Sequence, residues 1–264
     1  MAKRVKRNKV IRTYDGIDRE ESTAGLMALR IIIIIVIIAF IIFAAALFVY
    51  NIQKETDDIT DTVSVAESGA FYQQYDEEQS QRLLVYCNNS VSISEYYSVE
   101  LSFFNDDVQV SSLMLESLNR MIQAAKADGV KLDVVQGYMS YDECNTKYQS
   151  MKLKLEEEGA TLAEAESKTR SVFPQGGNNE YQTGMLIKMS SEDSSDFSKS
   201  DAYAWLYKNG INYGFINRYT DEKTSFTGIE EDLTVFRFVG TENAQKMRRF
   251  GMCLEEYYDY CSYR

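Results

Sequence analysis

The longest uninterrupted apolar stretch of the chain lies near its N-terminus. Residues 31–50 read IIIIIVIIAFIIFAAALFVY, twenty positions without a charged side chain. As a helix rising 1.5 Å per residue they would cover about 30 Å, the thickness of the hydrocarbon core of a bilayer. The pattern therefore predicts a transmembrane helix over residues 31–50. A cleaved signal peptide is the alternative, because residues 31–43 have the length of a signal core and Ala44 and Ala46 form a small-x-small pair.

The segment after this span has no regular apolar period. Residues 51–81 are polar, acidic and rich in Ser and Thr, which is typical of an extended or partly helical stalk. The pattern changes at residue 82, where apolar positions begin to recur. We therefore expect a folded domain over residues 82–264.

Short alternating stretches and amphipathic stretches are interleaved within this domain. Alternation predicts strands at residues 82–87, 130–135, 214–219 and 234–240. Helical spacing, N-cap residues and terminal glycines predict helices around the stripe Leu115, Leu118, Ile122 and Ala125 and at residues 146–159, 161–170, 198–210 and 242–260. This mixture, without a regular βαβ repeat, indicates an α+β fold with a small central antiparallel sheet flanked by helices.

Charge is divided unevenly between the two sides of the predicted span. Residues 1–30 carry eight Lys and Arg against four Asp and Glu, and the rest of the chain carries 20 against 36. A basic segment beside the first span predicts a cytoplasmic tail at residues 1–30 and an exported, extracytoplasmic C-terminal part. The basic run KRVKRNK could instead contact nucleic acid or anionic lipid. The acidic exported part argues against nucleic acid as its own partner.

The four cysteines, Cys87, Cys144, Cys253 and Cys261, all lie in the part that is predicted to be exported, where disulfides are permitted. No C-x-x-C pair occurs, which argues against a thiolate metal site. On one continuous helix Cys253 and Cys261 would be about 12 Å apart, too far for a disulfide. The sequence leaves the pairing open.

Several stretches of residues 82–264 resemble one known family. They are QGYMSYDEC from Gln136, EYQTGM from Glu180, the long segment from Ala204 to Glu230, FRFVG from Phe236 and CLEEY from Cys253. On these stretches the domain is similar to the VanY-type D-alanyl-D-alanine carboxypeptidases, bacterial zinc peptidases that remove the terminal D-alanine of cell-wall stem peptides. The resemblance implies a hedgehog/DD-peptidase-like fold, a bacterial cell and a role at its peptidoglycan.

The functional positions of that family fall on different residue types here. The resemblance places its first zinc-binding histidine at Tyr181, its zinc-binding aspartate at Lys188 and its second histidine at Val235. Its general-base glutamate falls on Asp232, and the arginine that is expected to hold the substrate carboxylate falls on Met139. The chain contains no histidine at all.

Zinc chemistry makes these replacements consequential. A catalytic zinc needs about three protein ligands and a water whose pKa it lowers. A neutral tyrosine is a poor ligand, a valine cannot bind a metal, and a lysine ammonium repels the cation. Asp232 alone has no activated water to act on. We therefore expect no catalytic residue, no zinc and no other cofactor, although family likeness alone predicts a zinc carboxypeptidase.

A ligand groove is still a candidate in the absence of catalysis. On the resemblance it is lined by Met139, Ser140, Tyr141, Gln182 and Arg237. Strand alternation places Arg237 on the same face as Val235, with Phe236 and Phe238 opposite, and Arg237 could bind an anionic ligand there. The alternative is a structural arginine that bonds backbone carbonyls or an acidic neighbour.

Three functions remain open. The first is a membrane-anchored pseudoenzyme that binds a cell-wall stem peptide or a cell-wall protein partner. The second is an active carboxypeptidase with an unconventional site, and the third is a purely structural ectodomain. One structural prediction is specific: Lys188 and Asp232 form an ion pair that links two strands where the resemblance expects a metal.

Overall fold

The computed structural model describes residues 32, 33, 36, 70–190 and 196–263. The predicted cytoplasmic tail, nearly all of the predicted transmembrane helix and most of the predicted stalk lie outside these residues. Within the described ranges no helix is both long enough and apolar enough to cross a bilayer. The chain divides into one unit at Met1–Ala66 and a second at Glu67–Arg264, and all elements below belong to the second.

A four-stranded antiparallel sheet forms the centre of the second unit. Its strand order is β3 (Asp133–Gln136), β4 (Leu186–Ser190), β6 (Asp232–Phe238) and β5 (Phe215–Tyr219). Two short strands, β1 (Leu101–Phe103) and β2 (Gln109–Ser111), pair separately. The strands predicted at residues 130–135, 214–219 and 234–240 are confirmed, with ends that differ by a few residues. The predicted α+β architecture with a small antiparallel sheet is therefore present.

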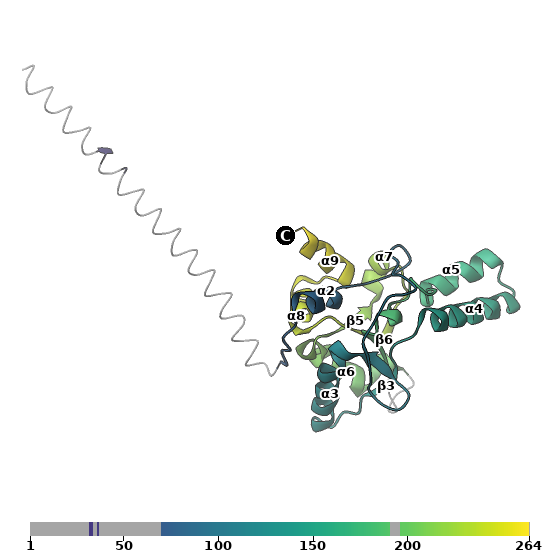
Figure 1. The fold of residues 1–264 in the computed structure, drawn as a ribbon, viewed down its shortest axis with the longest axis horizontal. Helices are drawn as coiled ribbons and strands as arrows, with labels where there is room; N and C mark the ends of the chain where they lie inside the picture. Colours follow the sequence, from purple (N-terminus) through teal and green to yellow (C-terminus); the bar gives the residue numbers. More distant parts are fainter. Residues whose placement is uncertain (1–31, 34–35, 37–69, 191–195, 264) are drawn as a thin grey trace, which may run out of the picture. The chain divides into compact units, whose positions relative to one another are not determined.

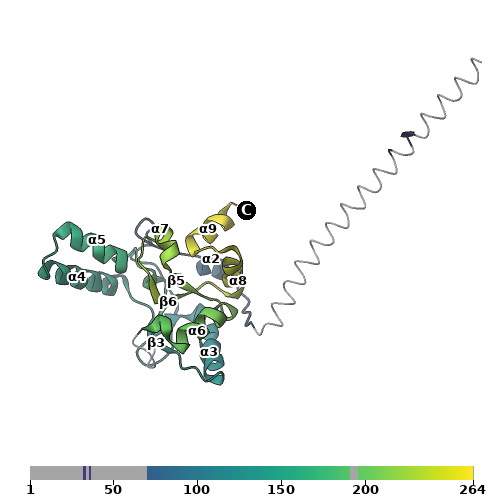
Figure 2. The same cartoon turned by 180° about the vertical axis from the view of Figure 1, so that it is seen from behind.

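Helices and short 3₁₀ turns surround this sheet. They are α2 (Glu77–Leu83), α3 (Ser112–Ala127), α4 (Tyr141–Glu157), α5 (Leu162–Val172), η1 (Glu180–Thr183), η2 (Phe197–Lys199), α6 (Asp201–Asn209), η3 (Gly210–Tyr213), η4 (Asp221–Lys223), α7 (Thr224–Thr227), α8 (Thr241–Phe250) and α9 (Leu254–Ser262). In Figures 1 and 2, α4 and α5 lie side by side as a hairpin that projects from the body, while α3 and α6 lie together at another side of the sheet.

The main hydrophobic core fills the space between one face of the sheet and the helices α3 and α6. Of the stripe that the sequence predicts on α3, Leu118 and Ala125 are fully inaccessible, whereas Leu115 and Ile122 are only partly buried. The stripe packs with Ile187 of β4 and with Phe236 and Phe238 of β6 in one cluster. Because side chains alternate along a strand, the other face of the sheet is left for a second cluster, in which the candidate site lies.

Local capping explains where two of the predicted helices begin. Ser140 caps α4 and Thr161 caps α5, each in a reciprocal capping box with a glutamate three residues later, Glu143 and Glu164. α4 therefore starts at Tyr141, five residues before the helix predicted at 146–159. The N-cap predicted at Thr161 is confirmed.

The segment predicted as a strand at residues 82–87 is not a strand. Its first two residues end helix α2, which Asp76 caps by accepting a hydrogen bond from the Gln79 amide at 2.8 Å. This cap lies in the stretch that the sequence analysis assigned to the stalk. In addition, the Phe71 amide donates to the Asn212 carbonyl at 2.7 Å. The packed domain thus begins before residue 82, within the predicted stalk.

The single helix predicted at residues 242–260 is in fact two helices. Gly251 ends α8 in the left-handed conformation, with φ of +63°, and the chain then starts α9 after Cys253. A glycine adopts this backbone conformation without the steric cost that a side chain would add. The cysteines Cys87, Cys144, Cys253 and Cys261 are all free thiols in this structure, and the first three are buried.

Candidate functional site

The candidate site is built on the turn that leads from η1 into β4. Asn179 caps η1 by accepting a hydrogen bond from the Tyr181 amide at 3.2 Å. Gly184 closes the turn with φ of +68°, and a Cβ there would lie 3.1 Å from the Ser111 amide nitrogen. The glycine therefore allows both the backbone angle and the close approach of β2. The turn directs Tyr181 into the interior and sets the start of the strand that carries Lys188.

Two of the predicted degenerate ligand positions are packed shut. Tyr181 is 6% exposed and Val235 is 3% exposed, and both belong to one hydrophobic cluster. The Tyr181 ring stacks on Phe173 with 6.2 Å between centroids. The other buried members of the cluster are Cys144, Tyr148, Leu186, Tyr219 and Ile229. Burial, with a smaller contribution from the charge of Asp232, raises the pKa of the Tyr181 phenol far above its ordinary value, so this phenol stays neutral.

The ion pair predicted between Lys188 and Asp232 is confirmed. Lys188 Nζ lies 2.8 Å from Asp232 Oδ2, and the two side chains are 39% and 34% exposed. Asp232 Oδ1 also accepts hydrogen bonds from the amide and the hydroxyl of Thr234. Since Lys188 lies on β4 and Asp232 on β6, the pair links the two central strands at the rim of the apolar cluster.

A second lysine, which the sequence analysis missed, faces the same place from α4. Lys147 Nζ donates to Gln136 Oε1 at 3.3 Å and lies 4.5 Å from the centroid of the Phe173 ring. Burial, followed by the positive charge of Lys188, lowers the pKa of Lys147. A signal for it was present: Lys147 follows the buried Cys144 by three residues, so it lies on the inner stripe of α4.

The five residues of the predicted ligand groove divide into two sets. Met139 packs against the apolar cluster and its amide donates to the Tyr181 carbonyl at 3.3 Å, while Ser140 and Tyr141 are half-buried at the start of α4. Gln182 and Arg237, in contrast, are 2% and 0% exposed. The expectation that these two line an open groove is therefore corrected, because both residues are almost completely inaccessible to solvent.

Both buried residues have structural partners. Arg237 donates to the carbonyls of Leu83 and Val85, at 3.1 and 2.6 Å, and to the hydroxyl of Thr183. This is the alternative in which the arginine bonds backbone carbonyls. Gln182 Oε1 accepts from the Gly177 amide at 2.8 Å, and its NH₂ group donates to a backbone carbonyl. Both side chains thus satisfy polar backbone groups that have no strand partner.

A buried ionic network lies directly behind the turn. Arg218 of β5 binds Glu180 Oε2 through Nε at 2.6 Å and Glu255 Oε1 through Nη2 at 2.7 Å. Asn88 also donates to Glu255. Although burial alone would raise the pKa of Glu255, Arg218 holds it below the ordinary value. Because Glu180 precedes Tyr181, this network fixes η1 to β5 and to α9.

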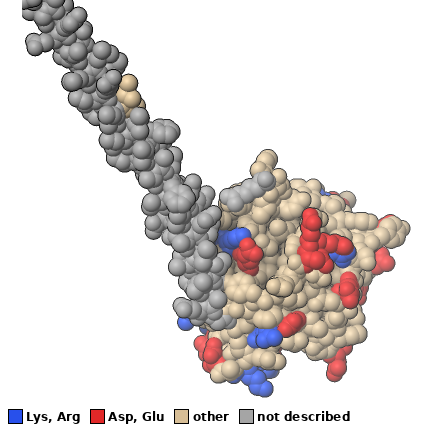
Figure 3. Space-filling view, turned by 60° about the vertical axis from the view of Figure 1, so that its left-hand side comes forward, with Lys and Arg blue, Asp and Glu red and all other residues tan. Residues whose placement is uncertain are grey.

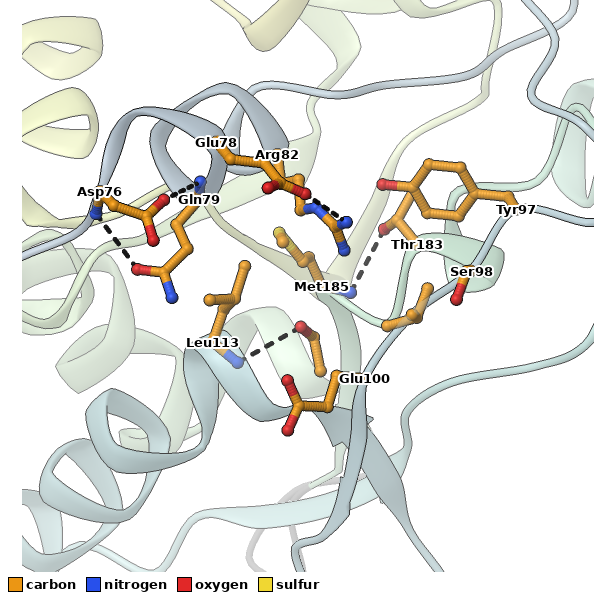
Figure 4. A pocket seen from close by; sticks show the side chains of 12 residues that line it. Asp76, Glu78, Gln79, Arg82, Tyr97, Ser98, Glu100, Leu113, Thr183 and Met185 are labelled. Carbon is orange, nitrogen blue, oxygen red and sulfur yellow. Dashed lines mark hydrogen bonds and ion pairs between the residues drawn. The ribbon is translucent and has the colours of Figure 1, made fainter.

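A separate hollow of about 190 Å³ lies beside Thr183 and Met185 (Figure 4). Its other lining residues are Asp76, Glu78, Gln79, Arg82, Tyr97, Ser98, Val99, Glu100, Ser111 and Leu113. The guanidinium of Arg82 is already paired with Glu78 at 2.7 Å, and Glu100 lies across the hollow from this pair. The residues of the apolar cluster do not line it.

The residues present do not fit a zinc ion. The apolar cluster offers only the thiol of Cys144 and, at its rim, the carboxylate of Asp232, which is already bound to Lys188. Burial raises the pKa of the Cys144 thiol to about 12, so it is not a thiolate at neutral pH. In residues 70–190 and 196–263, no three His, Cys, Asp or Glu side chains are grouped so that they could hold a metal.

The surface of the domain carries mixed charge. On the face seen in Figure 3, carboxylates are spread widely and several lie beside a lysine or an arginine. The exposed ion pairs of the domain include Arg120 with Glu116 and Lys246 with Glu242, each four residues apart on one helix. On this face the basic side chains are not gathered into a single patch.

The α+β fold, with its small antiparallel sheet flanked by helices, is like that of solved VanY-type D-alanyl-D-alanine peptidases. A family model described as VanY, D-alanyl-D-alanine carboxypeptidase, matches residues 107–241. A D-alanyl-D-alanine carboxypeptidase of Enterococcus faecalis is 30% identical over 185 residues, which is 70% of this chain and 68% of that protein. The chain belongs to the VanY family of D-alanyl-D-alanine carboxypeptidases.

Two solved structures agree with this assignment. One is a mutant of the vancomycin-resistance D,D-pentapeptidase VanY from a VanB-type cassette in complex with Zn(II); it is 29% identical, with a TM-score of 0.62, and covers 67% of this chain and 98% of its own. The other is VanYB in complex with D-alanine-D-alanine, 28% identical with a TM-score of 0.62, covering 67% of this chain and 97% of its own. The fold expected from the resemblance is thus supported over the domain.

Proposed function

We propose that this chain is a VanY-family domain without zinc-dependent carboxypeptidase activity, and that it binds a cell-wall stem peptide or a cell-wall protein partner. The proposal assigns the family's zinc-ligand positions to Tyr181, Lys188 and Val235 and its base position to Asp232. Loss of activity is inferred from the chemistry of these four side chains, while the retained fold supports a role in binding.

One observation carries the proposal. Of the four assigned positions, Tyr181 and Val235 lie inside one apolar cluster. Lys188 and Asp232 form an ion pair 2.8 Å long. Binding zinc there would require breaking that pair and placing a divalent cation next to an ammonium group and a valine. This costs electrostatic and desolvation free energy, and the Asp232 carboxylate is the one ligand gained in return.

The test is metal content together with activity, measured on the purified full chain. We expect less than about 0.1 zinc per chain after dialysis against zinc and no release of D-alanine from a stem pentapeptide, because fewer than three ligands are present. Stoichiometric zinc with D-alanine release would instead support the second candidate, an active carboxypeptidase, which family membership favours.

A gain-of-function variant tests whether the residues at these positions are the reason that zinc does not bind. The triple substitution Tyr181→His, Lys188→Asp and Val235→His supplies the donor set that the family uses, and we expect it to bind about one zinc per chain. A matched control replaces exposed residues of the same types with the same products, Tyr96→His, Lys154→Asp and Val91→His, and should bind none. Zinc binding by the control would mean that the gain is nonspecific.

The location of the domain is part of the proposal. A single uncleaved helix at residues 31–50, with a basic N-terminal tail, would place residues 51–264 outside the cell membrane. The exposed thiol of Cys261 offers a test. In intact cells a membrane-impermeant maleimide should label Cys261, and labelling only after lysis would contradict an extracytoplasmic domain.

A further inference from the structure

The charges at the candidate site are not balanced. Lys188 is paired with Asp232, but Lys147 has no carboxylate within ion-pair distance among the described residues. Its ammonium group is held by one neutral amide oxygen, of Gln136, and by the face of the Phe173 ring. Lys147 also interacts electrostatically with both Lys188 and Asp232. The site therefore holds two positive charges against one negative charge.

A third donor, on Gln136, neighbours both lysines. Gln136 of β3 pairs with Lys188 of β4 across the sheet. Because its amide oxygen accepts from Lys147, its NH₂ group is the part left to donate. Two ammonium groups and one amide NH₂ thus come from three elements, α4, β4 and β3. All three side chains are partly exposed, so a ligand can reach them from solvent.

We propose that Lys147, Lys188 and Gln136 form a binding site for a single carboxylate group, at the place where the rest of the family holds a metal cation. The inference rests on the proposed loss of zinc, and it specifies what the site binds instead. We call these three residues with Asp232 the lysine site.

The charge balance favours a carboxylate over a larger anion. One carboxylate brings the lysine site to neutrality, whereas a phosphate dianion would leave an excess negative charge beside Asp232. Charge-assisted hydrogen bonds from lysine to a carboxylate are among the stronger polar contacts. They also offset the burial and the like charge that lower the pKa of Lys147. The neighbouring apolar cluster, with Met139 at its edge, suits a small aliphatic group attached to the carboxylate.

Calorimetric titration of the full chain at neutral pH provides the test, with three probes: acetate, N-acetyl-D-alanyl-D-alanine and the C-terminal amide of the same dipeptide. We expect both acids to bind in the millimolar range and the amide to bind at least about tenfold more weakly, because it lacks the charge that the lysines recognise. If the dipeptide acid binds more tightly than acetate, the carboxylate is a peptide C-terminus; equal affinities identify a free small acid.

The matched variants are Lys147→Met and Lys152→Met. Both remove one lysine from α4, but Lys152 is not among the residues of the site. Methionine keeps an unbranched side chain and places a sulfur, which contacts aromatic rings favourably, near the Phe173 ring that the lysine ammonium faces. We therefore expect the variant to fold as the wild type does. Lys147→Met should weaken acid binding by about tenfold or more, and Lys152→Met should leave it unchanged.

Three results would overturn the carboxylate site: no binding of either acid at about 50 mM, equal binding of acid and amide, or equal losses in the two variants. Zinc content and D-alanine release are measured on the same preparation. A zinc-free, inactive protein that fails to bind acids overturns the lysine site and leaves the loss of catalysis standing. Zinc with D-alanine release overturns the proposed function itself.

Discussion

Two groups of charged residues meet at the turn of η1, and they differ in burial and in balance. Arg218 is 1% exposed and lies between the carboxylates of Glu180 and Glu255. The lysine site is about one-third exposed at its ion pair and has two cations for one carboxylate. The first group is closed, and although it has two carboxylates for one cation, each of its charges takes part in an ion pair, as burial of charge requires. The second is open and one anion short.

The contrast separates what holds the domain together from what can meet a ligand. A charge that is fully removed from water is retained only with partners, so the Arg218 network belongs to the scaffold. A surplus cation that keeps contact with water costs little in the free protein and gains a partner on binding. Substitutions in the first group should therefore reduce the free energy of unfolding strongly, and substitutions in the second group should hardly change it.

The largest effect is expected for Arg218→Met. The substitution leaves Glu180 and Glu255 buried without their guanidinium, which should reduce the free energy of unfolding by about 3–5 kcal/mol. Denaturant titration measures this loss. The control is Arg82→Met, whose pair with Glu78 is exposed and should be worth less than about 1 kcal/mol. Equal losses in both variants would remove the distinction between buried and exposed pairs.

A somewhat smaller loss is expected for Arg237→Met. This guanidinium is fully buried, but its hydrogen-bond partners are two carbonyls and a hydroxyl rather than a carboxylate. The variant leaves the Leu83 and Val85 carbonyls without their donor, at a cost of about 2–3 kcal/mol. Denaturation under the same conditions gives the comparison. A loss of unfolding free energy greater than that of Arg218→Met would show that pairing with carboxylates does not determine which buried arginine contributes more to stability.

Acid should weaken the buried network through Glu255. Its pKa is lowered in the folded protein, because Arg218 more than compensates for burial. A lowered carboxyl pKa adds stability that is complete above the unfolded pKa and is lost as the pH falls through the folded pKa. The midpoint of unfolding, measured as a function of pH, should therefore decrease as the pH falls below the ordinary range of carboxyl pKa values. In Glu255→Gln this decrease should be smaller, and an unchanged pH profile would argue against the assignment.

The smallest effect on stability is expected for Lys188→Met. Its ion pair with Asp232 is partly exposed, so the variant should lose less than about 1 kcal/mol. Lys154→Met, which breaks an exposed pair with Glu158 on α4, is the matched control. Thermal melts that show a loss of several kcal/mol for Lys188→Met alone would place Lys188 in the scaffold and not in an open site.

Alternation and capping were enough to predict most of the domain. The face assignments along β6 followed from period two, and the start of α5 followed from the Thr161 box. The α2 helix was missed because its cap at Asp76 lies in a stretch without apolar period. The break at Gly251 was missed because the residues on both sides favour a helix, and a single glycine does not always end one.

The site was only partly readable from the chain. The ion pair of Lys188 with Asp232 followed from the resemblance, which places both residues at functional positions of one metal site. The sequence left Arg237 with two interpretations, and the structure supports the one in which it bonds backbone carbonyls. Its particular partners could not be predicted, because they depend on where residues 83–85 run, and a strand was expected there. Lys147 joins the site from a helix that is distant in sequence from β6. Its spacing from Cys144 indicates the inner stripe of α4, but its proximity to Lys188 and Asp232 depends on how α4 packs.

The contacts of Arg237 also have a mechanical consequence. Hydrogen bonds hold residues 70–85, the segment that leads into the domain, at two places. The Phe71 amide donates to the Asn212 carbonyl and the Phe71 carbonyl accepts from the Thr241 hydroxyl, while the carbonyls of Leu83 and Val85 accept from Arg237. Arg237 lies five residues from Asp232 on the same strand. A pulling force applied at the entry of the chain is therefore carried into β6, the strand that supplies the acidic half of the lysine site.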